Sequence, residues 1–325
     1  MRRRATAAAA ALALAGLVAG NEVHAAGTAA ASSEQSDHYS RFVRRGSHQK
    51  TAGVRFCSWF SFACSDSGPI DRSFALVIGI SDYRYLDKLR WSATDVDRMT
   101  EYLLVDAGFA EVAVLRDSDA TVDATRHFMV DYFPNRLRGG SGRFVFYFSG
   151  HGETRWRGEV REEGYLRLAD NRPGRYRDAI AMSRIHDWAR NVSAARHTLF
   201  VIDACVSGLA GVERKRGLSP AVTVRQLMRH PGHHLLTAGG ADEDAWSGPR
   251  WDGSLFTAAL LHGLRTGAAD LTGDNLVTVS ELHTYTAGVV AKASGGAQTP
   301  QVRRLVTFRD LGELFFLSPR AAPAE

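Results

Sequence analysis

Residues 143–152 read Arg-Phe-Val-Phe-Tyr-Phe-Ser-Gly-His-Gly, and residues 198–208 read Thr-Leu-Phe-Val-Ile-Asp-Ala-Cys-Val-Ser-Gly. Each stretch opens with a continuous apolar run, which is typical of a strand buried on both faces of a parallel sheet. A histidine, His151, follows the first run, and a cysteine, Cys205, follows the second. Parallel strands end at the same edge of a sheet, so we expect these two side chains to meet there although they are far apart in the sequence.

The chain beyond about residue 72 alternates between two patterns. Mostly apolar runs that indicate strands occupy residues 74–80, 111–115, 143–148, 198–202 and 234–237. Apolar residues at helical spacing occupy residues 94–105, 121–137, 183–190, 254–264 and 278–293. This alternation predicts an α/β fold, with a mostly parallel sheet flanked by helices on both faces. Two long charged segments, 153–180 and 206–226, interrupt it, and we expect functional or mobile loops there.

A thiol paired with an imidazole indicates nucleophilic catalysis. A thiol attacks a carbonyl group as its thiolate, and His151 is placed to take the proton and later to protonate the leaving amine. The oxyanion of the tetrahedral intermediate needs backbone donors, for which the amides of Gly152 and Cys205 are the candidates. Taken singly, a buried core cysteine and a loop histidine are the commoner explanations. Their shared position just after two strands favours a catalytic dyad.

Both motifs also resemble those of a known family. Residues 149–152 (Ser-Gly-His-Gly) and 203–208 (Asp-Ala-Cys-Val-Ser-Gly) are similar to the catalytic histidine and cysteine motifs of the caspase and metacaspase superfamily of cysteine peptidases (peptidase C14 type), particularly its bacterial caspase-like members. Residues 74–83 resemble the first strand of that family, residues 89–95 the start of its first helix, and residues 253–260 the helix that follows its small-subunit strands.

This resemblance covers about residues 72–310 and implies a caspase-like three-layer sandwich, which we place at residues 72–318. It implies a cysteine endopeptidase that hydrolyses peptide or protein substrates through an acyl-enzyme, with Cys205 as nucleophile and His151 as acid and base. It further implies that neither a strict third catalytic residue nor a cofactor is needed for the chemistry.

The resemblance also suggests a substrate preference. In metacaspase-like members, an aspartate two residues before the catalytic cysteine and another in the first helix select Arg or Lys before the scissile bond, and the matching positions here are Asp203 and Asp95. A buried carboxylate favours a cationic side chain. The alternatives are a strand-end carboxylate that caps nearby amides for Asp203, and an acid favoured by the helix dipole for Asp95.

The chain departs from the metacaspase pattern at two places. Val206 stands where metacaspases commonly carry His, and the segment after His151 is too rich in Arg and Glu to match the calcium ligands of metacaspases. A preference for basic residues would make Arg214, Lys215 and Arg216 candidate sites of self-cleavage; a solvated basic loop is the alternative.

Residues 270–281 resemble a calcium-binding EF-hand loop. Asp270, Thr272, Asp274 and Glu281 fall at loop positions 1, 3, 5 and 12. Thr replaces an acid at the third position, and Asn275 replaces the usual Gly at the sixth. One fewer carboxylate weakens an ion site, so we favour an acidic loop that caps the next helix over a working calcium site.

The N-terminal residues are of a different kind. Residues 1–25 combine three arginines, an Ala/Leu-rich stretch and a small-residue cleavage pattern, which predicts a signal peptide and export to the periplasm or the extracellular space. The alternative is an uncleaved membrane anchor; no other run is long and apolar enough to span a bilayer. We interpret residues 26–71 as a linker or loosely ordered arm. Within it, Cys57 and Cys64 form a local disulfide or remain two separate thiols.

The net charge of the chain bears on which classes of partner it binds. The 325 residues carry a formal net charge of +5; loss of three arginines and Glu22 with the signal peptide leaves 5 − 3 + 1 = +3. This mild and scattered charge does not indicate nucleic-acid binding. Two other functions stay open: a catalytically silent caspase-fold module for binding or scaffolding, and a different thiol hydrolase or transpeptidase acting on envelope peptides. The sequence indicates no oligomeric state.

Overall fold

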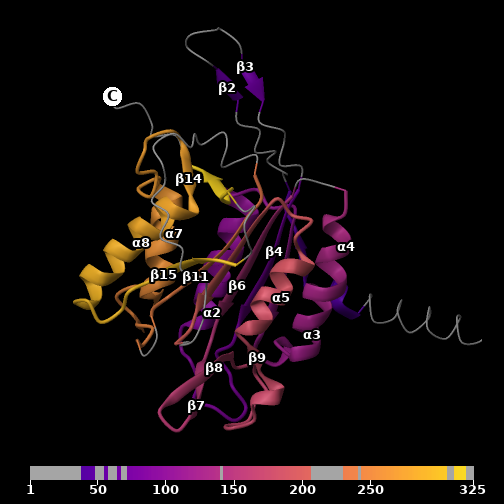
Figure 1. Ribbon diagram of the computed structural model, residues 1–325, viewed down its shortest axis with the longest axis vertical. Coiled ribbons are helices and arrows are strands. Elements are labelled where there is room, and N and C mark those ends of the chain that lie inside the picture. Colours follow the sequence, from indigo (N-terminus) through magenta and orange to yellow (C-terminus); the bar gives the residue numbers. More distant parts are fainter. Residues whose placement is uncertain are drawn as a thin grey trace, which may run out of the picture. The chain divides into compact units, whose positions relative to one another are not determined.

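The computed structural model describes residues 38–47, 55–57, 64–66, 72–139, 142–205, 230–240, 243–305 and 311–319 (Figure 1). Two compact units divide the chain, residues 1–43 and residues 44–325. In the first unit, the described residues include one helical turn at residues 38–40. Everything that follows concerns the second unit, apart from Val43, which begins the first strand of the central sheet. The predicted signal peptide and the basic residues Arg214, Lys215 and Arg216 lie outside the described residues.

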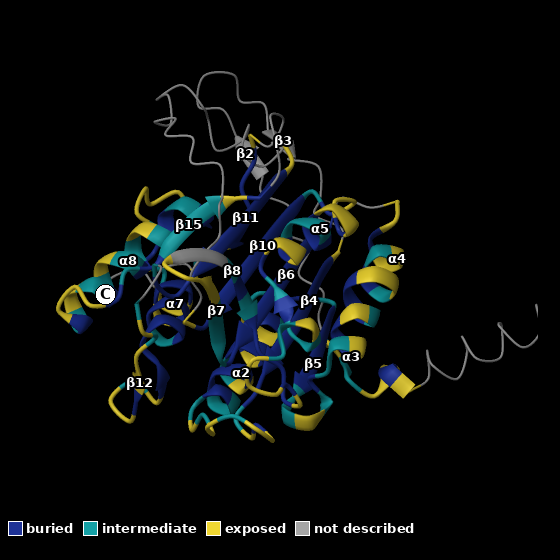
Figure 2. Cartoon of the chain, turned by 60° about the horizontal axis from the view of Figure 1, so that its bottom comes forward, coloured by how far each residue is buried: buried dark blue, intermediate teal, exposed yellow. Residues whose placement is uncertain are grey.

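A seven-stranded sheet forms the centre, with the strand order β1-β5-β4-β6-β10-β11-β15. Its strands are β1 (Val43–Arg45), β4 (Ser73–Gly79), β5 (Glu111–Arg116), β6 (Arg143–Ser149), β10 (His197–Asp203), β11 (Gly232–Thr237) and β15 (Gln301–Arg304). The pairs β5–β4, β4–β6, β6–β10 and β10–β11 are parallel, whereas β15 runs antiparallel to β11. Every residue of β4, β6 and β10 is buried, as their continuous apolar sequences require (Figure 2).

Helices cover both faces of this sheet, which confirms the predicted three-layer α/β sandwich. They are α2 (Ser92–Glu101), α3 (Val122–Arg126), α4 (Phe133–Leu137), α5 (Ser183–Asn191), α7 (Leu255–Thr266) and α8 (Val279–Ser294). Side chains alternate along β6: Val145 and Tyr147 pack in one core with α2, α7 and α8. Phe144 and Phe146 face the other side, where the Phe146 ring lies 5.8 Å from that of Trp188 in α5.

π-Helical turns follow or interrupt two of the predicted helices. One turn, η1 (Tyr102–Asp106), directly follows α2, and another, η3 (His127–Tyr132), separates α3 from α4. The predicted helix at 121–137 is therefore three consecutive segments. Thr121 caps its start as expected, because its Oγ1 accepts from the Ala124 N–H at 3.1 Å.

The prediction of a loop at residues 153–180 was wrong. This segment forms an antiparallel sheet of β7 (Gly152–Arg157), β8 (Val160–Leu166) and β9 (Ile180–Ala181), with a 3₁₀ turn, η4 (Tyr176–Asp178), before β9. A solvated hairpin buries little of either face, so its charged residues carried no apolar alternation that would have revealed it.

Three smaller antiparallel pairs complete the described strands. They are β2 (Arg55–Cys57) with β3 (Cys64–Asp66), β12 (Ser247–Gly248) with β13 (Gly253–Ser254), and β14 (Leu276–Thr278) with β16 (Phe315–Leu317). The first pair sets the Cys57 and Cys64 backbones opposite each other. Their disulfide stays a prediction.

The loop at residues 270–281 caps α8. Both carboxylate oxygens of Asp270 accept hydrogen bonds from the backbone of the loop, including the Asn275 N–H at 2.9 Å. Glu281 accepts from the amide and hydroxyl of Thr272 with one oxygen and from those of Thr278 with the other, which completes a capping box. Asn275 adopts a left-handed φ of 67°. Calcium binding there stays a prediction; in the described part of the chain, no cluster of three His, Cys, Asp or Glu side chains is arranged to hold a metal ion.

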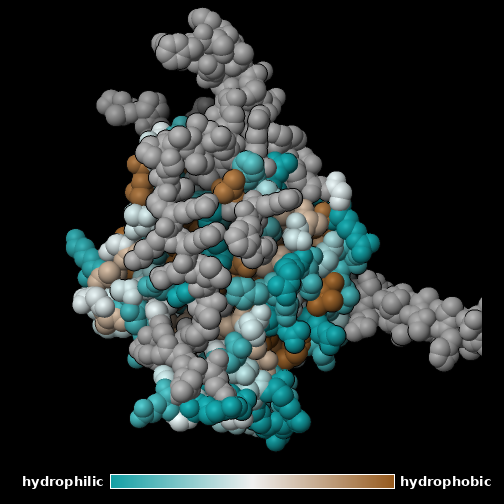
Figure 3. All heavy atoms as spheres, in the orientation of Figure 1, coloured by the Kyte–Doolittle hydropathy of each residue, from teal (hydrophilic) through white to brown (hydrophobic). Residues whose placement is uncertain are grey.

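The described surface is largely hydrophilic on the face shown in Figure 3, where the hydrophobic areas are small and separate. None of the helices formed by the described residues has both the length and the apolar character needed to cross a bilayer.

Candidate active site

The sheet register brings His151 and Cys205 to one place. Ser149 and Asp203 are paired residues at the ends of the adjacent parallel strands β6 and β10. His151 and Cys205 each follow two residues later. The Gly150 N–H donates to the Asp203 carbonyl at 3.2 Å, which joins the two strand ends beyond the sheet. Both candidate catalytic residues line a single cleft, together with the predicted oxyanion residue Gly152 and the predicted specificity residues Asp95 and Asp203.

A closed set of hydrogen bonds holds the His151 backbone. The His151 N–H donates to the Tyr83 hydroxyl at 2.7 Å, this hydroxyl donates to the Arg167 carbonyl at 3.0 Å, and the Arg167 N–H donates to the His151 carbonyl at 2.9 Å. The Tyr83 and His151 rings lie 4.8 Å apart. A Cβ on Gly150 would approach the Tyr83 hydroxyl to 2.5 Å, so this close packing requires glycine. Burial raises the pKa of Tyr83 well above its usual range, and the phenol stays protonated.

The His151 ring is oriented by a main-chain carbonyl. Its Nε2 lies 2.7 Å from the Asp87 carbonyl oxygen, which can only accept a hydrogen bond. The neutral ring therefore carries its proton on Nε2, which leaves the Nδ1 lone pair available to a thiol proton. Sequence reasoning missed this contact because a backbone acceptor can be supplied by any residue type and leaves no signal.

The Cys205 thiol needs a base. Burial raises its pKa, the charges of Asp244 and Asp203 raise it further, and the Ala245 N–H, which donates to Sγ at 3.1 Å, lowers it. A raised pKa means that the thiol is predominantly protonated near neutral pH. In this environment, the thiol must lose its proton to a base before it can attack, and His151 is the candidate base.

Two buried carboxylates, Asp95 and Asp203, line the cleft. The Ser254 N–H, at the start of α7, donates to both carboxylate oxygens of Asp95 at 3.1 Å each. The Thr257 hydroxyl donates to Asp203 Oδ2 at 2.6 Å, and it lies 2.7 Å from the Tyr147 hydroxyl. Burial is the main cause that raises the pKa of both aspartates, and the negative charge of Asp203 raises that of Asp95 further. Such a pair favours either a shared proton or a cation from outside.

The Arg98 charge lowers the pKa of Asp95, but burial outweighs it. Arg98 donates from Nη1 to the carbonyls of Trp251 and Asp252, at 3.1 and 3.0 Å. Gly253, which has a φ of 150°, packs so close that an added Cβ would come within 2.2 Å of Asp95 Oδ1. The cleft thus contains the thiol and two acids, and backbone and hydroxyl donors hold the acids in place.

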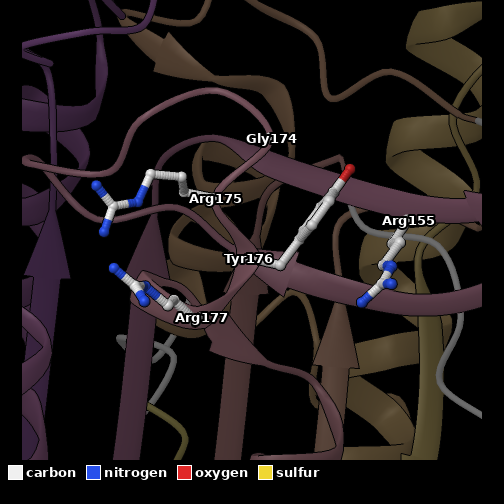
Figure 4. A pocket seen from close by; sticks show the side chains of 5 residues that line it. All are labelled: Arg155, Gly174, Arg175, Tyr176 and Arg177. Atoms are coloured by element: carbon white, nitrogen blue, oxygen red, sulfur yellow. The ribbon is translucent and has the colours of Figure 1, made fainter.

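A second cavity, of about 480 Å³, lies between β7 and the turn η4 (Figure 4). Arg175 and Arg177 point to one side of Tyr176 and Arg155 lies on its other side. The first two pair with Asp178, and the Arg155 guanidinium lies 5.5 Å from the centre of the Tyr176 ring. This cavity shares no lining residue with the cleft that holds Cys205.

Comparisons with known proteins agree with this architecture. The family model of the caspase domain, peptidase C14, matches residues 72–311. Among solved structures, caspase-1 from Spodoptera frugiperda is similar, with a TM-score of 0.52 and 15% identity over 78% of this chain and 92% of that chain. A protein from Geobacter sulfurreducens gives a TM-score of 0.49 and 14% identity over 75% of this chain and 99% of that chain. No curated protein sequence matched.

The resemblance inferred from the two motifs is thereby confirmed. The matched region contains both strand ends of the cleft, His151 and Cys205 included. The likeness to the insect caspase, at 15% identity, supports the fold. The chain belongs to the caspase-domain family of cysteine peptidases.

Proposed function

We propose that this protein is an exported cysteine endopeptidase that cleaves peptide bonds after Arg or Lys. The observation that carries the proposal is the single cleft in which His151 and Cys205 lie with two buried acids, Asp95 and Asp203. The family supports peptidase chemistry in general. The acids and the dyad support the finer assignment.

The reaction begins with proton transfer. His151 Nδ1 takes the Cys205 thiol proton while Nε2–H stays bonded to the Asp87 carbonyl. Sγ then attacks the substrate carbonyl carbon, the C–S bond forms, and the electron pair moves to the carbonyl oxygen. The amides of Gly152 and Cys205 donate to this oxyanion.

The tetrahedral intermediate then expels the amine. The C–N bond breaks, the protonated His151 donates its Nδ1 proton to the leaving amine, and an acyl-enzyme on Cys205 remains. Neutral His151 then takes a proton from water, the resulting hydroxide attacks the thioester carbonyl, and the thiolate leaves and is reprotonated. Atoms and charges balance without a cofactor.

Substrate choice follows from the paired acids. A lysine or arginine side chain that enters the cleft supplies the positive charge that Asp95 and Asp203 lack. Binding the cation lowers the pKa of both acids toward ordinary values, so any proton that the raised pKa values retain is released as the substrate binds. An acidic side chain at the same place meets like charge, and an apolar one leaves the carboxylates unpaired.

Cleavage of fluorogenic peptides by the wild type and by Cys205→Ala tests the proposal. The panel places Arg, Lys, Asp or Leu before the scissile bond, with and without calcium. Release that depends on Cys205 and occurs after Arg or Lys is the expected result, and Asp203→Asn should then lose it. Release only after Asp or Leu keeps the peptidase and rejects the basic preference. No Cys205-dependent release from any peptide favours the silent binding module.

A further inference from the structure

A backbone amide points directly at the nucleophile. The Ala245 N–H donates to Cys205 Sγ at 3.1 Å. Ala245 belongs to the segment that leads from β11 to β12 and lines the cleft beside Trp246. Because this segment has no regular secondary structure at residues 243–246, something else must hold it in place.

The Gln298 side chain holds the segment that carries Ala245. This side chain is wholly buried in the turn between α8 and β15. Its Nε2 donates to the Ala238 carbonyl at 2.9 Å, and its Oε1 accepts from the Trp246 N–H at 3.0 Å. One amide side chain therefore bridges the end of β11 and the residue directly after Ala245. Gln298 itself is anchored, because its N–H donates to the Ser294 hydroxyl at 3.0 Å.

Glu243 holds the same segment through Thr299, the residue that follows Gln298. One carboxylate oxygen accepts from the Thr299 N–H at 2.6 Å and from the Gly240 N–H at 2.9 Å, and the other accepts from the Thr299 hydroxyl. Gln298 and Thr299, two adjacent residues after α8, thus hold the segment: Gln298 bonds the Trp246 N–H, and Thr299 bonds the Glu243 carboxylate. The Gln298 and Glu243 side chains therefore position the Ala245 amide, although neither side chain lines the cleft.

A donor at this position acts on the thiolate. A hydrogen bond to an ionised acceptor is about twice as strong as one to its neutral form, so an N–H near sulfur favours ionisation. The other groups around Cys205 differ in sign: the charges of Asp244 and Asp203 raise the thiol pKa, whereas the backbone N–H of Cys205 lowers it. His151 lines the same cleft and gains a positive charge as the thiolate forms. The Ala245 amide is a fixed donor from another segment of the chain, and it acts against these two acids.

We propose that the Ala245 amide is a catalytic donor that stabilises the Cys205 thiolate, and that Gln298 is the residue that positions this donor. The catalytic consequence rests on the proposed peptidase function, whereas the effect on the thiol does not. The two can therefore be tested separately.

The test measures the pH dependence of Cys205 alkylation by iodoacetamide in the full chain, with mass spectrometry of the Cys205 peptide to separate it from Cys57 and Cys64. Gln298→Met removes both side-chain hydrogen bonds, and Glu243→Gln weakens the second anchor. Each variant should raise the apparent thiol pKa by about one unit, which lowers the alkylation rate about tenfold below that pKa. The limiting rate at high pH should stay unchanged.

Thr286→Val is the matched control. Its buried hydroxyl lies on α8 and makes no hydrogen bond among the described residues, so the variant alters a buried polar group without touching the segment. Its alkylation profile should match that of the wild type. If Gln298→Met does not fold, Glu243→Gln decides. A folded variant of either kind that keeps the wild-type profile overturns the proposal. A shifted profile in a protein that cleaves no peptide supports the donor and rejects the peptidase.

Discussion

Gly253→Ala should remove the proposed preference for basic residues while leaving the candidate dyad of Cys205 and His151 intact. The added Cβ would lie 2.2 Å from Asp95 Oδ1, whereas ordinary contacts begin at 3.4 Å, so the carboxylate or the backbone must move by 3.4 − 2.2 = 1.2 Å. The φ of 150° at Gly253 also disfavours any side chain. Both effects act at the residue next to Ser254, whose N–H holds Asp95.

The size of the effect follows from this displacement. A shift of about 1 Å in a positioning group costs on the order of 100-fold in rate, so kcat/KM for an Arg peptide should fall about 100-fold. Backbone strain should lower the free energy of unfolding by about 1–3 kcal/mol. Turnover of a matched Leu peptide, whatever its level in the wild type, should change much less, because Cys205 and His151 lie on other elements.

The assay compares both peptides in wild type, Gly253→Ala and Gly288→Ala, with urea unfolding of each protein. Gly288 lies within α8, where an added Cβ meets nothing within 4 Å, so alanine there should stabilise the helix by about 1 kcal/mol and leave cleavage unchanged. A Gly253→Ala protein that cleaves the Arg peptide with wild-type kcat/KM would refute the assignment of Asp95 to the specificity pocket.

Three further predictions concern the buried polar groups. Burial raises the pKa of Asp203 from 3.8 to about 6, so the folded state binds the proton more tightly and stability falls as pH rises from 3.8 to about 6. Asp203→Asn should flatten this decline in urea unfolding compared at about pH 4 and about pH 6; an unchanged slope would contradict it. Burial lowers the pKa of His234 to about 3, from 6.5, so stability should fall by up to about 4–5 kcal/mol as pH drops from 6.5 toward 3. His234→Leu should lose that acid sensitivity in thermal melts, and an equally steep loss in the variant would count against His234 as the source. Tyr83→Phe removes the hydroxyl that joins His151 to the Arg167 carbonyl, and kcat should fall about tenfold with little change in KM; a change confined to KM would reject a role in positioning His151.

The central sheet was predictable because burial on both faces leaves a continuous apolar signal. The run predicted at 143–148 became β6 (Arg143–Ser149), and the run at 198–202 became β10 (His197–Asp203). Once these strands are parallel neighbours, His151 and Cys205 must follow at one edge, which is why two residues separated by long segments could be paired from the sequence.

The surroundings of the dyad were less predictable, for a physical reason. Asp87 acts through its backbone carbonyl, and Ala245 acts through its backbone N–H, so neither role depends on the side chain. Gln298 acts across the fold on residues more than fifty positions away, and no local periodicity encodes such a contact. The β7–β8 hairpin was missed because its solvated faces lack apolar alternation.

The sequence Asp203-Ala204-Cys205 limits how the proposed substrate preference can change in evolution. Two peptide units separate the candidate specificity acid from the nucleophile, so their Cα atoms lie no more than about 7 Å apart. Because β6 and β10 fix the strand end, this spacing cannot be lengthened without shifting Cys205 away from His151. New specificities are therefore accessible by replacing the Asp203 side chain or its partners Thr257 and Asp95, but not by relocating the acid. The candidate nucleophile and one of the two candidate specificity acids are therefore inherited together, within one three-residue segment.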